Sequence, residues 1–152
     1  MGKAVETEQD YTCDSPIVTD VPQAPLPASF LEALAGREEV LVSSREGDLV
    51  GSVRAWFVLT PAGYVYLFAD ARSVRMRRWR SDPWVRLTVP GTGASAEGMV
   101  EPVPAGEIDT ELGELVVERW GMWGAATPEG LRRMVRDGSH VLLRVSGLLT
   151  PS

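Results

Sequence analysis

Six arginines between Asp70 and Arg86 are the residues of this chain best suited to binding an anion. They occupy positions Arg72, Arg75, Arg77, Arg78, Arg80 and Arg86. Two acids oppose them, so the segment carries a net charge of +4 within a chain whose net charge is -6. An arginine fork binds two oxygens of one phosphate at once. This positive segment in an acidic chain indicates a site for a phosphate or a similar anion.

The spacing within this segment places cations beside the start of a helix. Ser73 is a suitable N-cap for a helix over residues 73–81, and the free N–H groups of a helix start favour phosphate. Arg72, Arg75 and Arg78 recur every third residue, which predicts one helix flank. A solvated helix face with arginines paired to surface carboxylates is the alternative, and composition leaves both open.

A second group of candidate residues lies on a predicted strand. Residues 49–60 alternate in polarity, so that Arg54 and Trp56 share one face while Ala55 and Phe57 share the other. Arg54 is a further candidate for the anion site. Trp56 offers an aromatic surface against which a flat ring can pack.

Short strands and short helices must position these residues. Apolar alternation and turn residues predict six strands, at residues 40–45, 49–60, 64–69, 84–89, 94–103 and 140–148. Helical spacing and caps predict helices at residues 27–36, 73–81, 108–120 and 128–137. Gly98 is expected to form a bulge. Six antiparallel strands of this length predict a closed or partly closed barrel, because closure removes exposed sheet edges.

The chain length of 152 residues fits one domain. Residues 1–26 are polar and proline-dotted, which predicts a flexible N-terminal arm before a domain over residues 27–150. The net charge of -6 argues against a nucleic-acid partner, which would need a basic surface. No apolar run is long enough for a signal peptide or a membrane span, so we expect a cytoplasmic protein.

The chain is poor in residues for metal binding and acid–base catalysis. The single cysteine, Cys13, cannot form an intrachain disulfide, which suits a reducing compartment, and we interpret it as an incidental thiol. The single histidine, His140, begins a strand and is expected to be structural or exposed. One cysteine and one histidine do not make a zinc site, so no metal and no catalytic dyad are expected.

The order of these motifs resembles a known family. Val53-Arg54-Ala55-Trp56-Phe57 follows a Glu46-Gly47-Asp48 turn, and after a further strand come Ser73-Val74-Arg75 and Asp82-Pro83-Trp84-Val85-Arg86-Leu87. This set is similar to the pyridoxamine-phosphate-oxidase-like, FMN-binding split-barrel proteins. Their pattern has an R-x-V-W-F-like strand and then S-x-K-x-R-x-L-x-x-D-P-x-V-x-L. The resemblance covers residues 28–104 in order, and residues 140–148 match the closing strand.

The resemblance implies a mainly β fold with flanking helices, a six-stranded antiparallel split β-barrel that forms a homodimer. It implies an oxidoreductase that binds FMN non-covalently and transfers electrons to or from a small-molecule substrate. Ser73 and Arg75 match the family's phosphate-contacting Ser and Lys, and Arg78 is a further candidate. Arg54, Ala55 and Trp56 match the strand along the isoalloxazine ring. An aromatic side chain from the partner subunit is often part of such sites, and Trp120 or Trp123 could supply it, although core packing is the expectation for Trp120.

Several departures from the family pattern keep other functions open. Asp70 falls in the cofactor-binding segment near a usual Thr or Ser, where a carboxylate repels phosphate unless it turns away. It favours a cofactor-free barrel acting as a binding or scaffold module. Deazaflavin F420 is the other alternative, with Arg77, Arg80 and Arg86 available for its acidic tail. The chain lacks the C-terminal arginine-containing tail of true pyridoxamine-phosphate oxidases, so that activity is not expected.

Overall fold

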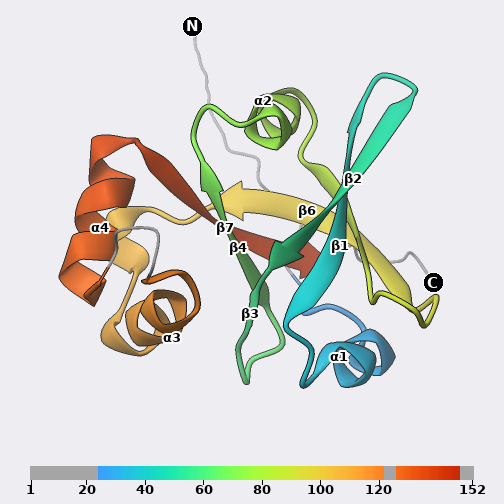
Figure 1. Ribbon diagram of the computed structural model, residues 1–152, viewed down its shortest axis with the longest axis horizontal. Helices are drawn as coiled ribbons and strands as arrows, with labels where there is room; N and C mark the ends of the chain where they lie inside the picture. Colours follow the sequence, from blue (N-terminus) through green and yellow to red (C-terminus); the bar gives the residue numbers. More distant parts are fainter. Residues whose placement is uncertain (1–23, 122–125, 148–152) are drawn as a thin grey trace, which may run out of the picture.

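An antiparallel sheet, curled into a half-barrel, forms the body of the computed structural model, which describes residues 24–121 and 126–147 (Figure 1). Within these residues the sheet has seven strands in the order β2-β1-β5-β6-β7-β4-β3. Their bounds are β1 Glu39–Glu46, β2 Leu49–Trp56, β3 Val58–Leu59, β4 Val65–Asp70, β5 Trp84–Thr88, β6 Ser95–Pro102 and β7 His140–Gly147.

The strand count differs from the six that the sequence predicted. The predicted strand over residues 49–60 is interrupted at Phe57, which is buried in the core. Before this residue β2 pairs with β1, and after it β3 pairs with β4. The two edge strands of the sheet are therefore consecutive in the chain, and the sheet must curl so that one segment can serve both edges.

The adjacent strands β4 and β7 bury both of their faces. Leu67 and Val145 point into the half-barrel, where they belong to the larger apolar core. Phe68 and Leu142 point outward into a second core, beneath helices α3 (Thr110–Trp120) and α4 (Pro128–Asp137). In β7, Leu142 is buried because α3 and α4 cover the outer face of the sheet, as Figure 1 shows.

Helix boundaries follow the predicted caps closely. Ser73 caps α2 (Val74–Ser81) by accepting a hydrogen bond from the Met76 N–H at 3.3 Å. Thr127 caps α4 in the same way, and Gly138 ends it in the left-handed conformation with φ of 81°. The remaining helices are α1 (Ala28–Leu34), which packs against the larger core, and a 3-10 helix over Ala105–Glu107. None of the helices in the described part of the chain is long and apolar enough to cross a bilayer.

Ordered packing begins before the predicted domain start at residue 27. Ala24 forms a bridge to Gly147, and Leu26 is buried in the larger core. Residues 1–23, with the predicted arm and Cys13, lie outside the described residues, as does Trp123.

Gly98 does not form the predicted bulge. It keeps a regular register with Val85 of β5 and Gly147 of β7. A Cβ atom at this position would lie 2.1 Å from the Ser146 carbonyl oxygen. Glycine is needed here because β6 and β7 approach too closely for any side chain.

We expect Gly98→Ala to destabilise the barrel by about 1–3 kcal/mol, because the β6 and β7 backbones must move apart. Urea denaturation followed by circular dichroism measures the change. Gly106→Ala is the matched control, since a Cβ there meets no atom within 4 Å and the φ of Gly106 is not positive. Equal denaturation midpoints for Gly98→Ala and Gly106→Ala would contradict the assignment.

Candidate functional site

Two adjoining cavities lie along β2 and contain most of the predicted site residues. The arginine cavity, of about 340 Å³, is lined by Val42, Ser44, Gly51, Ser52, Val53, Ser73, Val74, Arg75 and Arg78. The tryptophan cavity, of about 310 Å³, is lined by Glu39, Val53, Arg54, Ala55, Trp56, Phe68, Arg75 and Trp120. Val53 and Arg75 belong to both, so the two cavities form one continuous site.

Arg75 is the most confined charged group of this site. Its guanidinium Nη2 donates to the Phe68 carbonyl oxygen at 3.1 Å, and the group lies 5.7 Å from the centroid of the Trp79 ring. Its Nη1 is buried and has no hydrogen-bond partner among the described residues. Burial lowers the pKa of Arg75, although a guanidinium stays protonated in proteins. The cavity wall thus holds a positive charge with an unused donor.

Arg78 also lines the arginine cavity, and its guanidinium comes unusually close to the backbone of β2. Its Nη1 lies 3.5 Å from the Ser44 hydroxyl, and its Nε lies 3.7 Å from a Glu46 carboxylate oxygen. A Cβ at Gly51 would come within 2.4 Å of that Nη1. Gly51 therefore leaves the space in β2 that the Arg78 guanidinium needs.

Ser73 reaches the same cavity from the start of α2. Its hydroxyl oxygen caps the helix through the Met76 N–H, so the hydroxyl hydrogen remains available as a donor. Ser73, Arg75 and Arg78 are thus brought to one cavity, as the sequence predicted. Arg72 precedes the cap residue and therefore does not belong to the helix flank that the sequence predicted for it. It lines neither cavity.

The predicted strand residues Arg54, Ala55 and Trp56 line the tryptophan cavity together. Arg54 forms an ion pair with Glu39 of β1 at 3.5 Å, and both side chains are substantially exposed. The far wall is aromatic, because Phe68 and Trp120 pack with ring centroids 5.6 Å apart. Trp120 is buried, as expected for a core residue, and it also lines this cavity.

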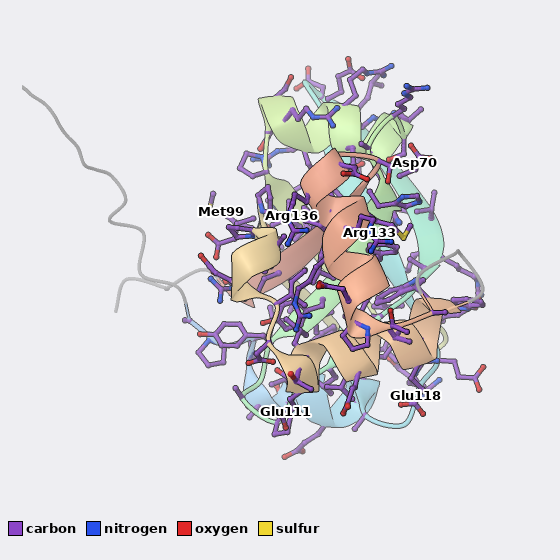
Figure 2. The ribbon with its side chains drawn as sticks, turned by 90° about the vertical axis from the view of Figure 1, so that its left-hand side faces the viewer. Asp70, Met99, Glu111, Glu118, Arg133 and Arg136 are labelled. Carbon is purple, nitrogen blue, oxygen red and sulfur yellow. The ribbon has the colours of Figure 1, made fainter. Side chains whose placement is uncertain are left out.

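Asp70 is the predicted site residue that the structure does not bring to either cavity. It ends β4, where its carboxylate accepts a hydrogen bond from the Arg72 N–H at 2.8 Å. Figure 2 shows Asp70 at the end of the molecule that carries α2. The carboxylate is therefore engaged in local turn structure, which reduces its repulsion of an anion in the arginine cavity.

The other arginines of the positive segment interact with their own chain. Arg77 pairs with Glu46 at 3.3 Å, and Arg80 donates to the Ala71 carbonyl oxygen at 2.7 Å. Arg86 lies 5.4 Å from the centroid of the Trp84 ring. None of the three lines either cavity.

Sequence reasoning missed several lining residues. Ser44 and Gly51 are a polar residue and a glycine within predicted strands. Their role in accommodating the Arg78 guanidinium becomes clear only when α2 is known to pack beside these strands. Phe68 had the pattern of an ordinary core residue. Trp120 was named as an aromatic that a partner subunit could supply, but its place beside the cavity of its own chain was not predicted. Glu39 precedes the predicted strand start and carried no signal.

Comparison with solved structures shows that this chain has a split-barrel fold. A search of protein-family models found no match, and neither did a search of curated proteins. Solved structures do match. A pyridoxamine 5'-phosphate oxidase candidate from Listeria innocua is 16% identical, with a TM-score of 0.54 over 78% of this chain and 90% of that one.

Two further structures carry cofactor names. An FAD-binding protein from Mesorhizobium loti is 16% identical, with a TM-score of 0.51 over 78% of this chain and 85% of that one. An F420 reductase is 14% identical, with a TM-score of 0.52 over 81% of this chain and 96% of that one. The predicted resemblance to the split-barrel fold is confirmed, and at these identities the likeness concerns the fold alone.

The position of α2, and hence of its arginines, depends on a contact at the other end of the helix. The Arg45 Nε of β1 donates to the Asp82 carboxylate at 2.6 Å, and the same carboxylate accepts from the Trp84 N–H at 3.1 Å. The hydrogen bond from Arg45 is the main cause that lowers the pKa of Asp82 below its usual value. This contact fixes the end of α2 to the strand that carries Ser44.

We expect part of the stability of the protein to disappear as acid protonates Asp82. Because the pKa of Asp82 is lower in the folded state, its contribution is present above the unfolded pKa and is lost as pH falls through the folded pKa. Asp82→Asn should therefore show a smaller decrease in Tm than the native protein between neutral pH and pH about 3. Parallel decreases in calorimetry would contradict a role for the Arg45–Asp82 contact.

Proposed function

We propose that this protein is an FMN-dependent oxidoreductase that binds the flavin phosphate in the arginine cavity and the isoalloxazine ring in the tryptophan cavity. The observation that carries the proposal is Arg75, which lines both cavities and whose buried Nη1 has no hydrogen-bond partner among the described residues.

The electrostatics of the arginine cavity favour an anion. A buried charge without a full set of hydrogen bonds is unfavourable, and a phosphate oxygen would complete the donors of Arg75. Arg78 adds a second guanidinium, and its buried Nε likewise lacks a hydrogen-bond partner within the described chain. Ser73 adds a hydroxyl donor at the start of α2. These groups suit a terminal phosphate better than a neutral ligand.

The tryptophan cavity has the chemistry of a site for a flat, mostly apolar ring. Trp56, Phe68 and Trp120 contribute aromatic surface, and Ala55 contributes a small side chain that allows close approach of a ring to β2. Each cavity falls at the lower end of the range for ligand sites, and together they suit a cofactor with a phosphate at one end. Bound FMN supplies the electron-transfer chemistry, while the chain supplies binding, orientation and electrostatics.

The structural neighbours support a flavin-type cofactor, since one is named as FAD-binding and another as an F420 reductase. We favour FMN over F420 because Arg77, Arg80 and Arg86, the candidates for an acidic tail, interact with their own chain instead. The local hydrogen bond of Asp70 weakens the main argument for a cofactor-free barrel.

Titration of the purified protein with FMN, followed by flavin fluorescence, tests the proposal. Arg75→Ala should weaken binding about ten- to a hundredfold, the loss expected for charge-assisted hydrogen bonds to phosphate. Arg80→Ala is the matched control on the same helix, since its guanidinium binds the Ala71 carbonyl outside the cavity. A parallel titration with F420 separates the two cofactors.

Three outcomes would contradict parts of the proposal. Absence of FMN binding would refute the flavin function, and binding of F420 in its place would change the cofactor. Equal losses for Arg75→Ala and Arg80→Ala would refute the assignment of the phosphate site.

We also propose that the protein is a homodimer whose second copy covers the β1–β2 hairpin. Figure 1 shows this hairpin extending beyond the rest of the sheet. Leu49 is 70% exposed and Val53 is 50% exposed on β2, while Val74 at the start of α2 is 55% exposed. Val53 and Val74 also line the arginine cavity, so a partner on this surface would shield the cofactor from water.

Light scattering coupled to size-exclusion chromatography tests this assembly across a concentration series. Leu49→Asp should shift the protein toward a monomer, because a charge would replace an apolar contact at the interface. Thr110→Asp, at an exposed position that begins α3, should leave the mass unchanged. A monomeric native protein, or a Leu49→Asp variant of unchanged mass, would contradict the proposed interface.

A further inference from the structure

Two further cavities follow the tryptophan cavity on the side away from the arginine cavity, and the proposed cofactor does not occupy them. The first of these two is called the second arm below. It has a volume of about 400 Å³, shares Glu39 and Arg54 with the tryptophan cavity and extends to Arg37 in the loop before β1. That cavity in turn shares Arg37 with one of about 540 Å³ between this loop, β3 and α3. Four adjoining cavities, together called the groove, therefore follow one another from Arg78, past Arg54, to Arg119 near the end of α3.

The cavity of about 540 Å³, called the far arm below, is lined by both positively charged and apolar side chains. Phe57, Leu59 and Leu115 provide apolar side chains, and Arg37 and Arg119 provide the positive charges. Arg37 makes only a long contact, from its Nη1 to the Pro90 carbonyl oxygen at 3.5 Å. Among residues 24–121 and 126–147, no carboxylate lies within ion-pair distance of either guanidinium. Both arginines can therefore bind a ligand anion without first losing a salt bridge.

Acidic residues on the same wall limit how much negative charge the arm accepts. Glu38 and Glu118 line this cavity together with the two arginines. Figure 2 shows Glu118 at the end of α3, far from the turn that holds Asp70. Their repulsion disfavours a ligand with several negative charges, which distinguishes this arm from the arginine cavity at the other end of the groove.

From this arrangement we infer that the redox substrate is an amphipathic organic monoanion, such as an aromatic carboxylate, held by the far arm. This inference names the substrate class and rests on the proposed function. The carboxylate binds Arg119 and Arg37, and the apolar body lies on Phe57, Leu59 and Leu115. The other end of the molecule reaches the junction at Arg54, beside the proposed ring site.

Isothermal titration calorimetry with 1-naphthoate and its neutral analogue 1-naphthamide tests the inference on the native protein without added flavin. We expect naphthoate to bind about ten times more tightly than the amide, as for a charged hydrogen bond. Arg119→Gln and, separately, Arg37→Gln should reduce this preference. Arg133→Gln, on the exposed surface of α4 shown in Figure 2, should leave it unchanged.

The same titrations in the presence of saturating FMN distinguish this inference from the proposed function. Continued naphthoate binding supports a separate arm, whereas displacement by FMN overturns it. Equal affinity for acid and amide, or no effect of either arginine variant, also overturns the inference while FMN binding stands. If naphthoate binds with the expected preference but FMN does not bind, the anion site stands and its role as a redox substrate site falls.

Discussion

The arrangement of this molecule depends on the passage of one chain segment between the two edges of the sheet. β2 pairs with β1, β3 pairs with β4, and Phe57 is the single residue between them. The sheet can satisfy both pairings only if it curls into a half-barrel. The curl gives the sheet a convex face for α3 and α4 and a concave face for the larger core. It also places the exposed side of β2 beside the α2 helix, where the continuous groove begins.

The arginines that line this groove come from several segments that the fold brings together, and not from one stretch of sequence. Arg75 and Arg78 come from α2, Arg54 from β2, and Arg37 and Arg119 from two segments far apart in the chain. Arg54 has an exposed ion pair with Glu39, while Arg75 and Arg37 each make a side-chain hydrogen bond to a carbonyl oxygen. Arg77 and Arg80, which interact with Glu46 and with the Ala71 carbonyl oxygen, lie outside the groove although they belong to the same helix as Arg75. The number of cations in one stretch of sequence therefore does not define the groove.

Much of the fold could be predicted from the sequence because its signals are local. The caps Ser73 and Thr127, the Asp82-Pro83 helix end and the Glu46-Gly47-Asp48 turn depend on neighbouring residues, and the structure has each of them. The strand break at Phe57 and the close approach at Gly98 could not be predicted, since both depend on which strands become neighbours.

The candidate site could likewise be predicted from the sequence only where local spacing determines the position of its residues. Ser73, Arg75, Arg78 and the Arg54–Trp56 strand meet as expected because α2 and β2 carry them in regular spacing. Asp70 does not join them because its carboxylate satisfies a turn N–H within two residues, a local contact that the charge pattern did not reveal. Glu39, Gly51 and Trp120 required knowledge of long-range packing.

The Glu39–Arg54 ion pair has a thermodynamic consequence. Both residues border the ring site and the second arm, so an occupant of either space changes the environment of the same two charges. Binding free energies at two sites that share such a contact are linked, and the linkage is reciprocal. If a ligand in one space changes the affinity for a ligand in the other by some factor, the reverse change has the same factor. This surface pair contributes little to stability, yet it is a contact that both proposed ligand spaces share.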